Sequence, residues 1–423
     1  MKSMLERAKL QRMKVAGLLV FALSLTGCAS VDSGGSEQAS LNEIIQKGLG
    51  ISAKPRSRTI TSSTPTGLQV DRLTGVQYQA MNFGDLSGWA NDDHQAALVS
   101  FKNSCAKIRG MRSNTPLGGI ITNLQDWRAV CAQAALTRDV NAKGFFEQHF
   151  KPVRIAPHKK ATLTAYYEPE LPARRIPDAQ FRFPIFNKPP ELISQGGSYG
   201  HNVSGRFQPY FTRGEIDRGA LHSRGLELAF LNDPVDLFFL QVQGSGRLRM
   251  GDNSLVRVGF AAKNGHAYRS VGKELVRRGW SRSGSRRAIQ DFVRGNPPLG
   301  FELLAHNKSY IFFRETAAQN PNFGPPGAID TQLMDKRSIA VDRRYTPLGA
   351  PVWVEGTTPV GGIAQLMIAQ DTGSAIKGPQ RADIFWGTGE AAGNIAGQMK
   401  DTRGRMTVLM PRFAVARAFG IRS

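Results

Sequence analysis

Three aspartates near the C-terminus lie where acid–base chemistry could be carried out. Asp342 ends the β-prone segment Ser338–Val341, and Asp371 follows the apolar run Leu366–Ala369. Asp383 lies in a third apolar segment rather than among other charges. Because aspartate is disfavoured inside strands, this pattern predicts that the three carboxylates gather at one rim of a sheet or barrel.

The neighbours of Asp383 distinguish it from the other two aspartates. Ile384, Phe385 and Trp386 follow it directly, and such neighbours desolvate a carboxyl group and raise its pKa. A raised pKa keeps a carboxylic acid protonated for general acid catalysis. The alternative for each aspartate is a turn residue that bonds its own backbone, which is common for Asp beside Gly.

Three ordered motifs around these aspartates resemble the three-aspartate double-psi β-barrel domain of the membrane-bound lytic murein transglycosylase A family. The motifs are Val341–Asp342 with Thr346–Gly349, then Gln370–Gly373 with Ile376–Gly378, then Ala382–Gly387. The resemblance covers most of the chain from about Gly67 onward. Ser374 departs from it, because the family usually has a second Gly at this position.

The resemblance implies a mainly β fold with flanking helices, in which a double-psi β-barrel domain is interrupted by a second, smaller β-rich domain. A cleft between the two domains is the expected ligand site, since ligands commonly bind between domains. The expected divisions are a lipoprotein signal peptide (1–27), a flexible tether (28–66), the first part of the barrel domain with its helices (67–166), the inserted domain (167–320) and the second part of the barrel domain (321–423).

The resemblance also implies a reaction. A lytic transglycosylase cleaves the β-1,4 bond between N-acetylmuramic acid and N-acetylglucosamine in peptidoglycan and leaves 1,6-anhydromuramic ends. An ordinary glycosidase needs two carboxylates, whereas here the muramyl 6-hydroxyl is the nucleophile, so one group can serve as acid and then as base. The family places this group on the third aspartate, Asp383. The alternative assignment makes Asp371 the acid, and neither assignment requires a cofactor.

Two functions of other classes remain open. A non-catalytic peptidoglycan-binding module would have the same barrel and an aromatic cleft, without turnover. A two-carboxylate glycoside hydrolase would use Asp371 and Asp383 and would leave reducing ends. The products formed from purified murein distinguish all three functions.

Sugar contacts are expected at the end of a strand predicted at Ala161–Pro169, which contains Tyr166 and Tyr167. Tyrosine rings can stack on a pyranose while their hydroxyls bond its oxygens; the alternative is a half-buried pair on an edge strand. Ala165 stands where the family usually has Gly. The resemblance assigns substrate-binding or supporting roles to Asp371, Asp342, Thr164, Tyr166, Tyr167, Gln243, Ser245 and Lys263.

The segment Leu237–Val242 is predicted to be a strand that continues to a Gly-Ser-Gly turn around Ser245. Alternation would place Gln241 and Gln243 on one face, and their amides suit sugar hydroxyls and N-acetyl groups. His266 is the one obvious general-base candidate nearby, with a hydrogen-bonded structural histidine as the alternative. No second His or Cys lies at ligand spacing, so no metal site is expected.

The charge balance indicates a polyanionic partner. Lys and Arg number 55 against 33 Asp and Glu, which gives a formal net charge of +22. No run of Lys or Arg is longer than two, so a basic arm for nucleic acid is not supported. Peptidoglycan glycan strands, whose stem peptides carry carboxylates, are the expected partner, and other proteins of wall synthesis could join them.

The N-terminus indicates export and a lipid anchor. A positively charged start precedes the apolar segment Val15–Leu25, which is too short to span a bilayer, and Leu25–Cys28 follows the lipoprotein cleavage pattern. Lipidation of Cys28 is expected, with an ordinary secretory signal as the alternative. Because Ala29 rather than Asp follows Cys28, sorting rules favour the outer membrane, facing the periplasm.

The two remaining cysteines lie in segments with helical periodicity. Cys105 ends the predicted helix 96–105, and Cys131 lies in the predicted helix 127–136, where Trp127 and Leu136 are expected to face a core. An oxidising compartment would allow a disulfide between them; a buried free pair is the alternative. Further strands are predicted at Phe181–Phe186, Glu227–Leu231, Val256–Phe260, Val352–Val354 and Met406–Met410, and a helix at Ala288–Arg294.

Overall fold

The computed structural model describes residues 61–62, 68–71, 75–119, 121–196, 198–317, 320–399 and 402–420. The predicted signal peptide, Cys28 and most of the predicted tether lie outside these residues. Thr61–Ser62, within the predicted tether, forms the short strand β1, which pairs with β2 at Leu68–Val70.

A closed barrel contains the three aspartate motifs. Within the described residues, one sheet has the order β1-β2-β3-β4-β19-β16-β17-β15-β18-β5, and β19 also pairs with β5, which closes the last six strands. Besides β1 and β2, the strands are β3 (Gln77–Ala80), β4 (Phe150–Ile155), β5 (Ala161–Glu168), β15 (Ser338–Val341), β16 (Pro351–Thr358), β17 (Gly361–Asp371), β18 (Arg381–Thr388) and β19 (Thr402–Pro411).

A second β-rich part is inserted between β5 and β15. In the described residues its larger sheet has the order β14-β13-β12-β6-β11-β7, and a separate small sheet has the order β10-β9-β8. Its strands are β6 (Glu170–Arg174), β7 (Phe183–Phe186), β8 (Ile193–Gln195), β9 (Ser198–Val203), β10 (Arg206–Gln208), β11 (Glu227–Leu231), β12 (Ser245–Arg249), β13 (Leu255–Lys263) and β14 (Ile311–Glu315). A barrel interrupted by a β-rich insert confirms the predicted fold class; the predicted domain limits stay a prediction.

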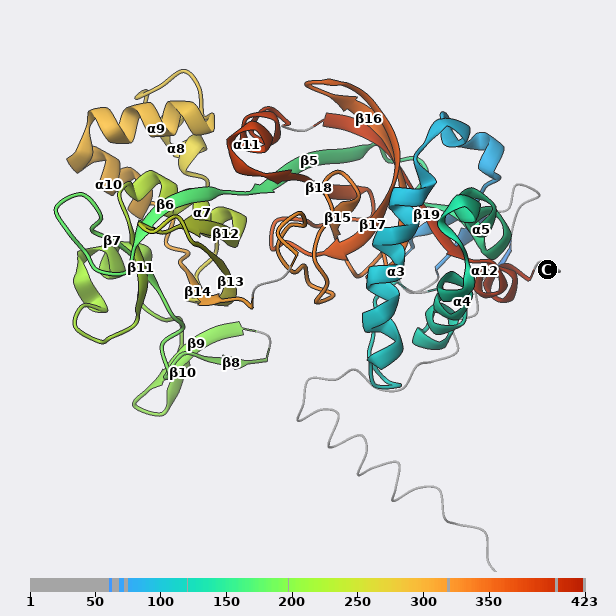
Figure 1. Ribbon diagram of the computed structural model, residues 1–423, viewed down its shortest axis with the longest axis horizontal. Coiled ribbons are helices and arrows are strands. Elements are labelled where there is room, and N and C mark those ends of the chain that lie inside the picture. The colour runs from blue at the N-terminus through green and yellow to red at the C-terminus, as the bar shows by residue number, and fades with distance from the viewer. Residues whose placement is uncertain are drawn as a thin grey trace, which may run out of the picture. The chain divides into compact units, whose positions relative to one another are not determined.

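Helices cover both parts. Near the barrel, α3 packs against β17, α11 against β5 and β18, and α12 against β19, while α4 and α5 pack against α3 (Figure 1). The helices are α3 (His94–Gly110), α4 (Leu124–Leu136), α5 (Ala142–His149), α6 (Arg213–Glu215), α7 (Pro234–Gln243), α8 (Val271–Arg277), α9 (Arg286–Gly295), α10 (Pro297–Ala305), α11 (Gly389–Gln398) and α12 (Arg412–Phe419), with short turns η1 (Phe83–Asp85), η2 (Trp89–Asn91), η3 (Asp139–Asn141) and η4 (Ile216–Ala220).

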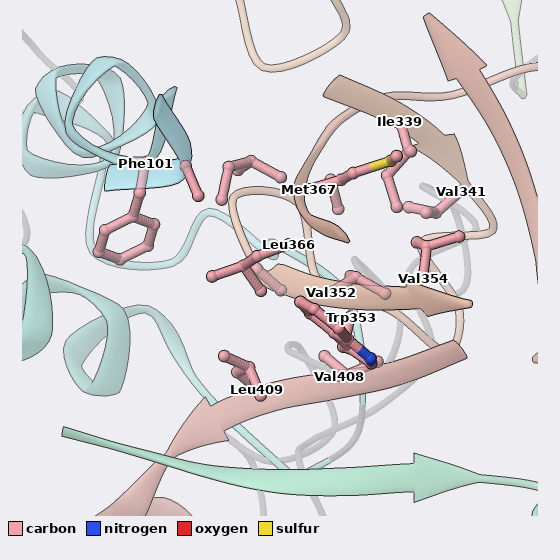
Figure 2. Packing of buried hydrophobic residues seen from close by; sticks show 14 of the residues in the cluster. Phe101, Ile339, Val341, Val352, Trp353, Val354, Leu366, Met367, Val408 and Leu409 are labelled. Atoms are coloured by element: carbon pink, nitrogen blue, oxygen red, sulfur yellow. The ribbon is translucent and has the colours of Figure 1, made fainter. Parts of the chain in front are cut away.

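The largest hydrophobic cluster joins the barrel strands to these helices. Figure 2 shows Trp353 of β16 beside Val408 of β19, and Phe101 of α3 reaching toward the same cluster. All three side chains are buried, and full burial of a side chain of this size contributes about 2–3 kcal/mol. The core therefore fixes the strands whose ends carry the aspartates.

A disulfide joins Cys105 of α3 to Cys131 of α4, with their Cα atoms 5.2 Å apart. This confirms the predicted bridge between two helices. Trp127 is fully buried as predicted, whereas Leu136 is 82% exposed, so its predicted place in the core is wrong. Leu136 is the last residue of α4, where the helix has already left the core.

The segment 237–242 is the main error of secondary structure. It belongs to α7, which begins after Asp233, whose carboxylate accepts hydrogen bonds from the N–H groups of Val235 and Asp236. Pro234 occupies the first helical position, where its missing N–H costs nothing. Gln241 is buried and Gln243 is the last helical residue, so the two amides do not share a strand face.

Candidate active site

The strand register brings the three aspartates to one rim of the barrel. β15 lies between β17, which is parallel to it, and β18, which is antiparallel. Ala340 of β15 pairs with Asp371 on one side and with Asp383 on the other, and Asp342 follows the last residue of β15. Since neighbouring strands lie about 4.8 Å apart, the Cα atoms of Asp371 and Asp383 are roughly 10 Å apart. The predicted gathering of carboxylates is confirmed.

Asp383 lies near the start of β18 beside the parallel strand β5, where it pairs with Thr164. The Thr164 hydroxyl donates a hydrogen bond to Oδ1 of Asp383. Oδ2 of Asp383 has no hydrogen-bond donor among the residues that the structure describes. Burial raises the pKa of this carboxyl, and the hydrogen bond from Thr164 and the charge of Arg381 only partly offset the rise. Asp383 can therefore hold a proton on a partly exposed side chain.

Asp371 has donors on both of its oxygens. Oδ1 accepts from the backbone N–H groups of Ala328 (3.0 Å) and Thr372 (2.8 Å), and Oδ2 accepts from the Tyr166 hydroxyl (2.9 Å). Burial nevertheless raises its pKa to about 6, against the lowering effect of these three donors. Asp371 therefore binds the loop residue Ala328 to the end of β17 and leaves no oxygen without a donor.

Asp342 is an ionised structural group. Its side chain is buried, and it accepts hydrogen bonds from the guanidinium of Arg344 and from the N–H of Gly378 at 2.8 Å. Burial raises its pKa, but the bonds from Arg344 and Gly378 outweigh this, and the pKa lies below its usual value. Asp342 thus fastens the loop after β17 to the end of β15.

The two tyrosines of β5 differ in their surroundings. Tyr166 is partly exposed, and its ring lies 5.4 Å from that of Phe385. Tyr167 is buried, its hydroxyl accepts a hydrogen bond from Arg286 of α9, and its N–H donates to Gln243 at 3.2 Å. Because consecutive strand residues point to opposite faces, the two rings do not form one stacking surface, and the sugar-binding role of each tyrosine stays a prediction.

The remaining predicted residues lie in the insert. Gln243 contacts Tyr167, and Ser245 begins β12, where it pairs with Gly259. Lys263 pairs with Ile311 at the other end of β13, and no described contact joins it to the aspartates. His266 lies 2.8 Å from the carbonyl of Tyr210 through Nε2, which fits the structural alternative.

Two charged groups near the rim were not predicted. Arg381 precedes Asp383 by two residues and donates to the Thr164 hydroxyl at 2.9 Å. Glu168, fully buried at the end of β5, pairs with Arg247 and Arg257, both at 2.8 Å. Arg381 could have been found from its spacing to Asp383, because residues i and i+2 share a strand face. Nothing in the sequence pairs Glu168 with arginines so distant in the chain.

Among the described residues, no group of three or more His, Cys, Asp or Glu is placed to hold a metal ion. In the same part of the chain, no helix is long and apolar enough to cross a membrane.

Comparison with known proteins gives consistent matches in both parts of the chain. The family model described as the MltA specific insert domain matches residues 162–314, and the 3D domain matches residues 337–410. The membrane-bound lytic murein transglycosylase A of Escherichia coli strain K12 is 35% identical over 317 residues, which span 72% of this chain and 78% of that protein. The chain belongs to the membrane-bound lytic murein transglycosylase A family.

Other members of the membrane-bound lytic murein transglycosylase A family support the same grouping. The Vibrio cholerae protein is 34% identical over 248 residues, 56% of this chain, but the match spans only 62% of that protein's length. A crystal structure of a membrane-bound lytic murein transglycosylase from Agrobacterium tumefaciens has a TM-score of 0.73 at 33% identity and covers 81% of this chain and 99% of that chain. E. coli MltA with bound chitohexaose has a TM-score of 0.58 at 26% identity, and the match covers 84% of this chain and 95% of that chain.

Proposed function

We propose that the chain is a lytic transglycosylase that cleaves the β-1,4 bond between N-acetylmuramic acid and N-acetylglucosamine in peptidoglycan, with Asp383 as its acid and then its base. The class of activity follows from membership of the family. One observation supports the choice of Asp383: its Oδ2 has no donor among the described residues, whereas both oxygens of Asp371 have donors. The pKa values do not decide which of the two aspartates is the acid, because burial raises the pKa of both Asp371 and Asp383.

In the first step, protonated Asp383 gives its proton from Oδ2 to the glycosidic oxygen, and the bond from that oxygen to C1 of the muramyl residue breaks. The muramyl ring then carries positive charge, which the new Asp383 carboxylate stabilises. In the second step, the muramyl 6-hydroxyl attacks C1, a bond from O6 to C1 forms, and Asp383 takes the hydroxyl proton. The proton count balances, and no water is consumed.

Asp371 and Asp342 support this cycle without transferring a proton. With a pKa of about 6, Asp371 is largely ionised at neutral pH, and its negative charge favours the positive muramyl ring. Its bond from Ala328 also holds the loop that approaches the rim. Asp342 fixes Gly378 on the other side. We propose that Tyr166, whose hydroxyl donates to Asp371, binds substrate together with Gln243 and Ser245, and the chitohexaose bound to the E. coli relative supports a glycan as ligand.

The relatives are named as membrane-bound proteins. We propose that lipidation of Cys28 anchors this chain in the outer membrane, where it faces the periplasmic murein. The sequence Leu25–Cys28 and the Ala29 that follows it support this proposal.

Product analysis tests the function. Purified murein is incubated with the enzyme, and the released muropeptides are separated and weighed by mass spectrometry. We expect 1,6-anhydromuramic ends. Reducing ends, 18 Da heavier through the added water, would instead identify a hydrolase that uses Asp371 and Asp383. Release of no fragment, with murein retained in a pull-down, would identify a binding module.

A further inference from the structure

The hydroxyl of Thr164 lies between a cation and the proposed acid. β5 and β18 run parallel, so Thr162 pairs with Arg381 and Thr164 pairs with Asp383. Nη2 of Arg381 donates to Oγ1 of Thr164 at 2.9 Å, and Oγ1 of Thr164 donates to Oδ1 of Asp383. Three side chains therefore form one chain of hydrogen bonds that ends on the carboxyl group.

The chemistry of these groups, together with the acceptors around them, sets the direction of the bonds in that chain. A guanidinium has donors only, so Thr164 must accept from Arg381. A threonine hydroxyl has one hydrogen and two lone pairs; Arg381 engages one lone pair, and Oδ1 of Asp383 is the one acceptor for the hydrogen among the described residues. Oδ1 is then an acceptor whether Asp383 is ionised or protonated. A proton on Oδ1 would leave the Thr164 hydrogen without a described acceptor, so the proton of protonated Asp383 is favoured on Oδ2, the oxygen that has no described donor.

Arg381 is itself held in place. Its Nη1 donates to the carbonyl of Thr162 at 3.3 Å and to the carbonyl of Ala382. The guanidinium is thus attached to both strands and cannot turn away from Thr164 without losing these bonds. Without Arg381, the Thr164 hydroxyl could rotate and accept a proton from Oδ1, and the acid would hold its proton on the oxygen that faces the protein.

We infer that Arg381 and Thr164 are positioning residues that confine the transferable proton of Asp383 to Oδ2, the oxygen that meets the glycosidic bond. The inference rests on the proposed role of Asp383. It adds that catalysis depends on the hydrogen bond from Thr164 to Asp383 as well as on Asp383 itself, and that Arg381 sets the direction of this bond.

Single variants test the role of each residue in the rate of anhydromuropeptide release. Arg381→Met and Thr164→Val should each lower kcat about fivefold to tenfold, the effect of one misdirected hydrogen bond, with KM for murein unchanged. Thr164→Ser, which keeps the hydroxyl, should restore kcat. Arg403→Met is the matched control, because Arg403 is exposed on β19 opposite the same Thr162, and it should leave kcat unchanged.

The double variant Arg381→Met with Thr164→Val gives the decisive comparison. If Arg381 acts through Thr164, the double variant has the same kcat as Thr164→Val alone, measured at a pH low enough to keep Asp383 protonated. If the loss of kcat in the double variant equals the product of the two single losses, the inference is overturned. Full activity of Arg381→Met would also overturn it. Thermal transitions of all variants are compared with that of the control, so that a variant that does not fold is recognised.

The pH profile gives a further readout that a merely structural role would not change. The titratable or charged groups near Asp383 are Arg381, Asp371 and Tyr166. Loss of the Arg381 charge removes an influence that lowers the pKa of Asp383, so the fall in rate at high pH should move to higher pH in Arg381→Met. An unchanged or opposite movement contradicts the inference. Near-normal activity of Asp383→Asn would contradict the proposed role of Asp383 itself. This result differs from those that contradict only the positioning role of Arg381 and Thr164, so the two failures can be distinguished.

Discussion

Two carboxyl groups on one barrel rim have raised pKa values, yet their hydrogen bonds give them different tasks. Asp371 is bonded on both oxygens, by two backbone N–H groups and by Tyr166. Asp383 accepts one described bond, from Thr164, on one oxygen. A group that must give and take a proton needs an oxygen that the substrate can reach, so geometry rather than acidity separates the acid from its neighbour.

The raised pKa of Asp371 predicts a pH dependence of stability. Burial raises the pKa from its ordinary value of 3.8 to about 6 in the folded protein, so the folded state holds a proton that the unfolded state releases between about pH 4 and pH 6. The free energy of unfolding should therefore fall as pH rises through this window. The full rise would correspond to about 3 kcal/mol, and partial exposure reduces the expected effect to about 1–2 kcal/mol.

Urea unfolding at pH 4 and pH 7 measures this effect. Asp371→Asn should lose less stability between the two pH values than the wild type, because asparagine does not titrate. Asp342→Asn is the control: the pKa of Asp342 is lowered, so its stabilising contribution is lost only below about pH 4, and this variant should keep the pH dependence of the wild type between pH 4 and pH 7. The same pH dependence in wild type and Asp371→Asn would contradict the assigned pKa.

At the scale of elements, the site depends on two crossings between the barrel and the insert. The chain leaves the barrel at Glu168, the last residue of β5, and returns through Pro321 and Phe323. Arg247 and Arg257 of the insert pair with the Glu168 carboxylate and also donate to these returning carbonyls: Arg247 to Pro321 and Phe323, and Arg257 to Phe323. Both crossings are therefore fastened at one buried ion cluster, and its carboxylate, Glu168, directly follows Tyr166 and Tyr167 in β5.

Glu168→Gln should be strongly destabilising. The Thr388 hydroxyl, which donates to Glu168 at 3.1 Å, would still find an acceptor oxygen. Two largely buried guanidinium groups would lose their counter-charge, however, and loss of one partner from a buried pair costs about 3–5 kcal/mol. The free energy of unfolding in urea checks this. Glu170→Gln is the matched control, because Glu170 pairs with Arg249 at a more exposed position and should cost less than about 1 kcal/mol. Equal losses for the two variants would refute the importance of the buried cluster.

The elements also show which parts of the site the sequence could predict. Apolar runs that end in Asp342 and Asp371 identified two barrel strands and their common rim, because a carboxylate marks the point where a strand leaves the core. The prediction of a strand at 237–242 is wrong, because its four consecutive apolar residues fit a strand or a buried helix equally well. The Asp233–Pro234 start signal before it would have favoured a helix.

The contacts of Asp383 could not be predicted in the same way. Thr164 and Asp383 are separated by 219 residues, and they meet because β5 and β18 pair in parallel across the whole insert. Register between such distant strands follows from the closed barrel rather than from local pattern. Family resemblance named Thr164, but the direction of its hydrogen bond, and the part of Arg381 in setting it, required the structure.

At the scale of the whole molecule, a strongly basic sequence, with a formal net charge of +22 over all 423 residues, and a proposed lipid anchor would hold the enzyme near an anionic wall. Cys28→Ser should prevent lipid attachment and release the protein into the soluble periplasmic fraction. Fractionation of cells and separation of the two membranes check this, with Ser30→Ala as a control that should stay with the outer membrane. A Cys28→Ser protein that still sediments with the outer membrane contradicts the anchor.

The most direct test of the central claim is the rate of anhydromuropeptide release by Asp383→Asn and Asp371→Asn, measured together with murein pull-down and thermal unfolding. Asp383→Asn keeps the shape of the side chain and removes the transferable proton, so its rate should fall at least ~100-fold, while binding and folding persist. Asp371→Asn should lose less, because asparagine can still accept from Ala328 and Thr372. Near-normal turnover by Asp383→Asn with an inactive Asp371→Asn would contradict the claim and make Asp371 the acid.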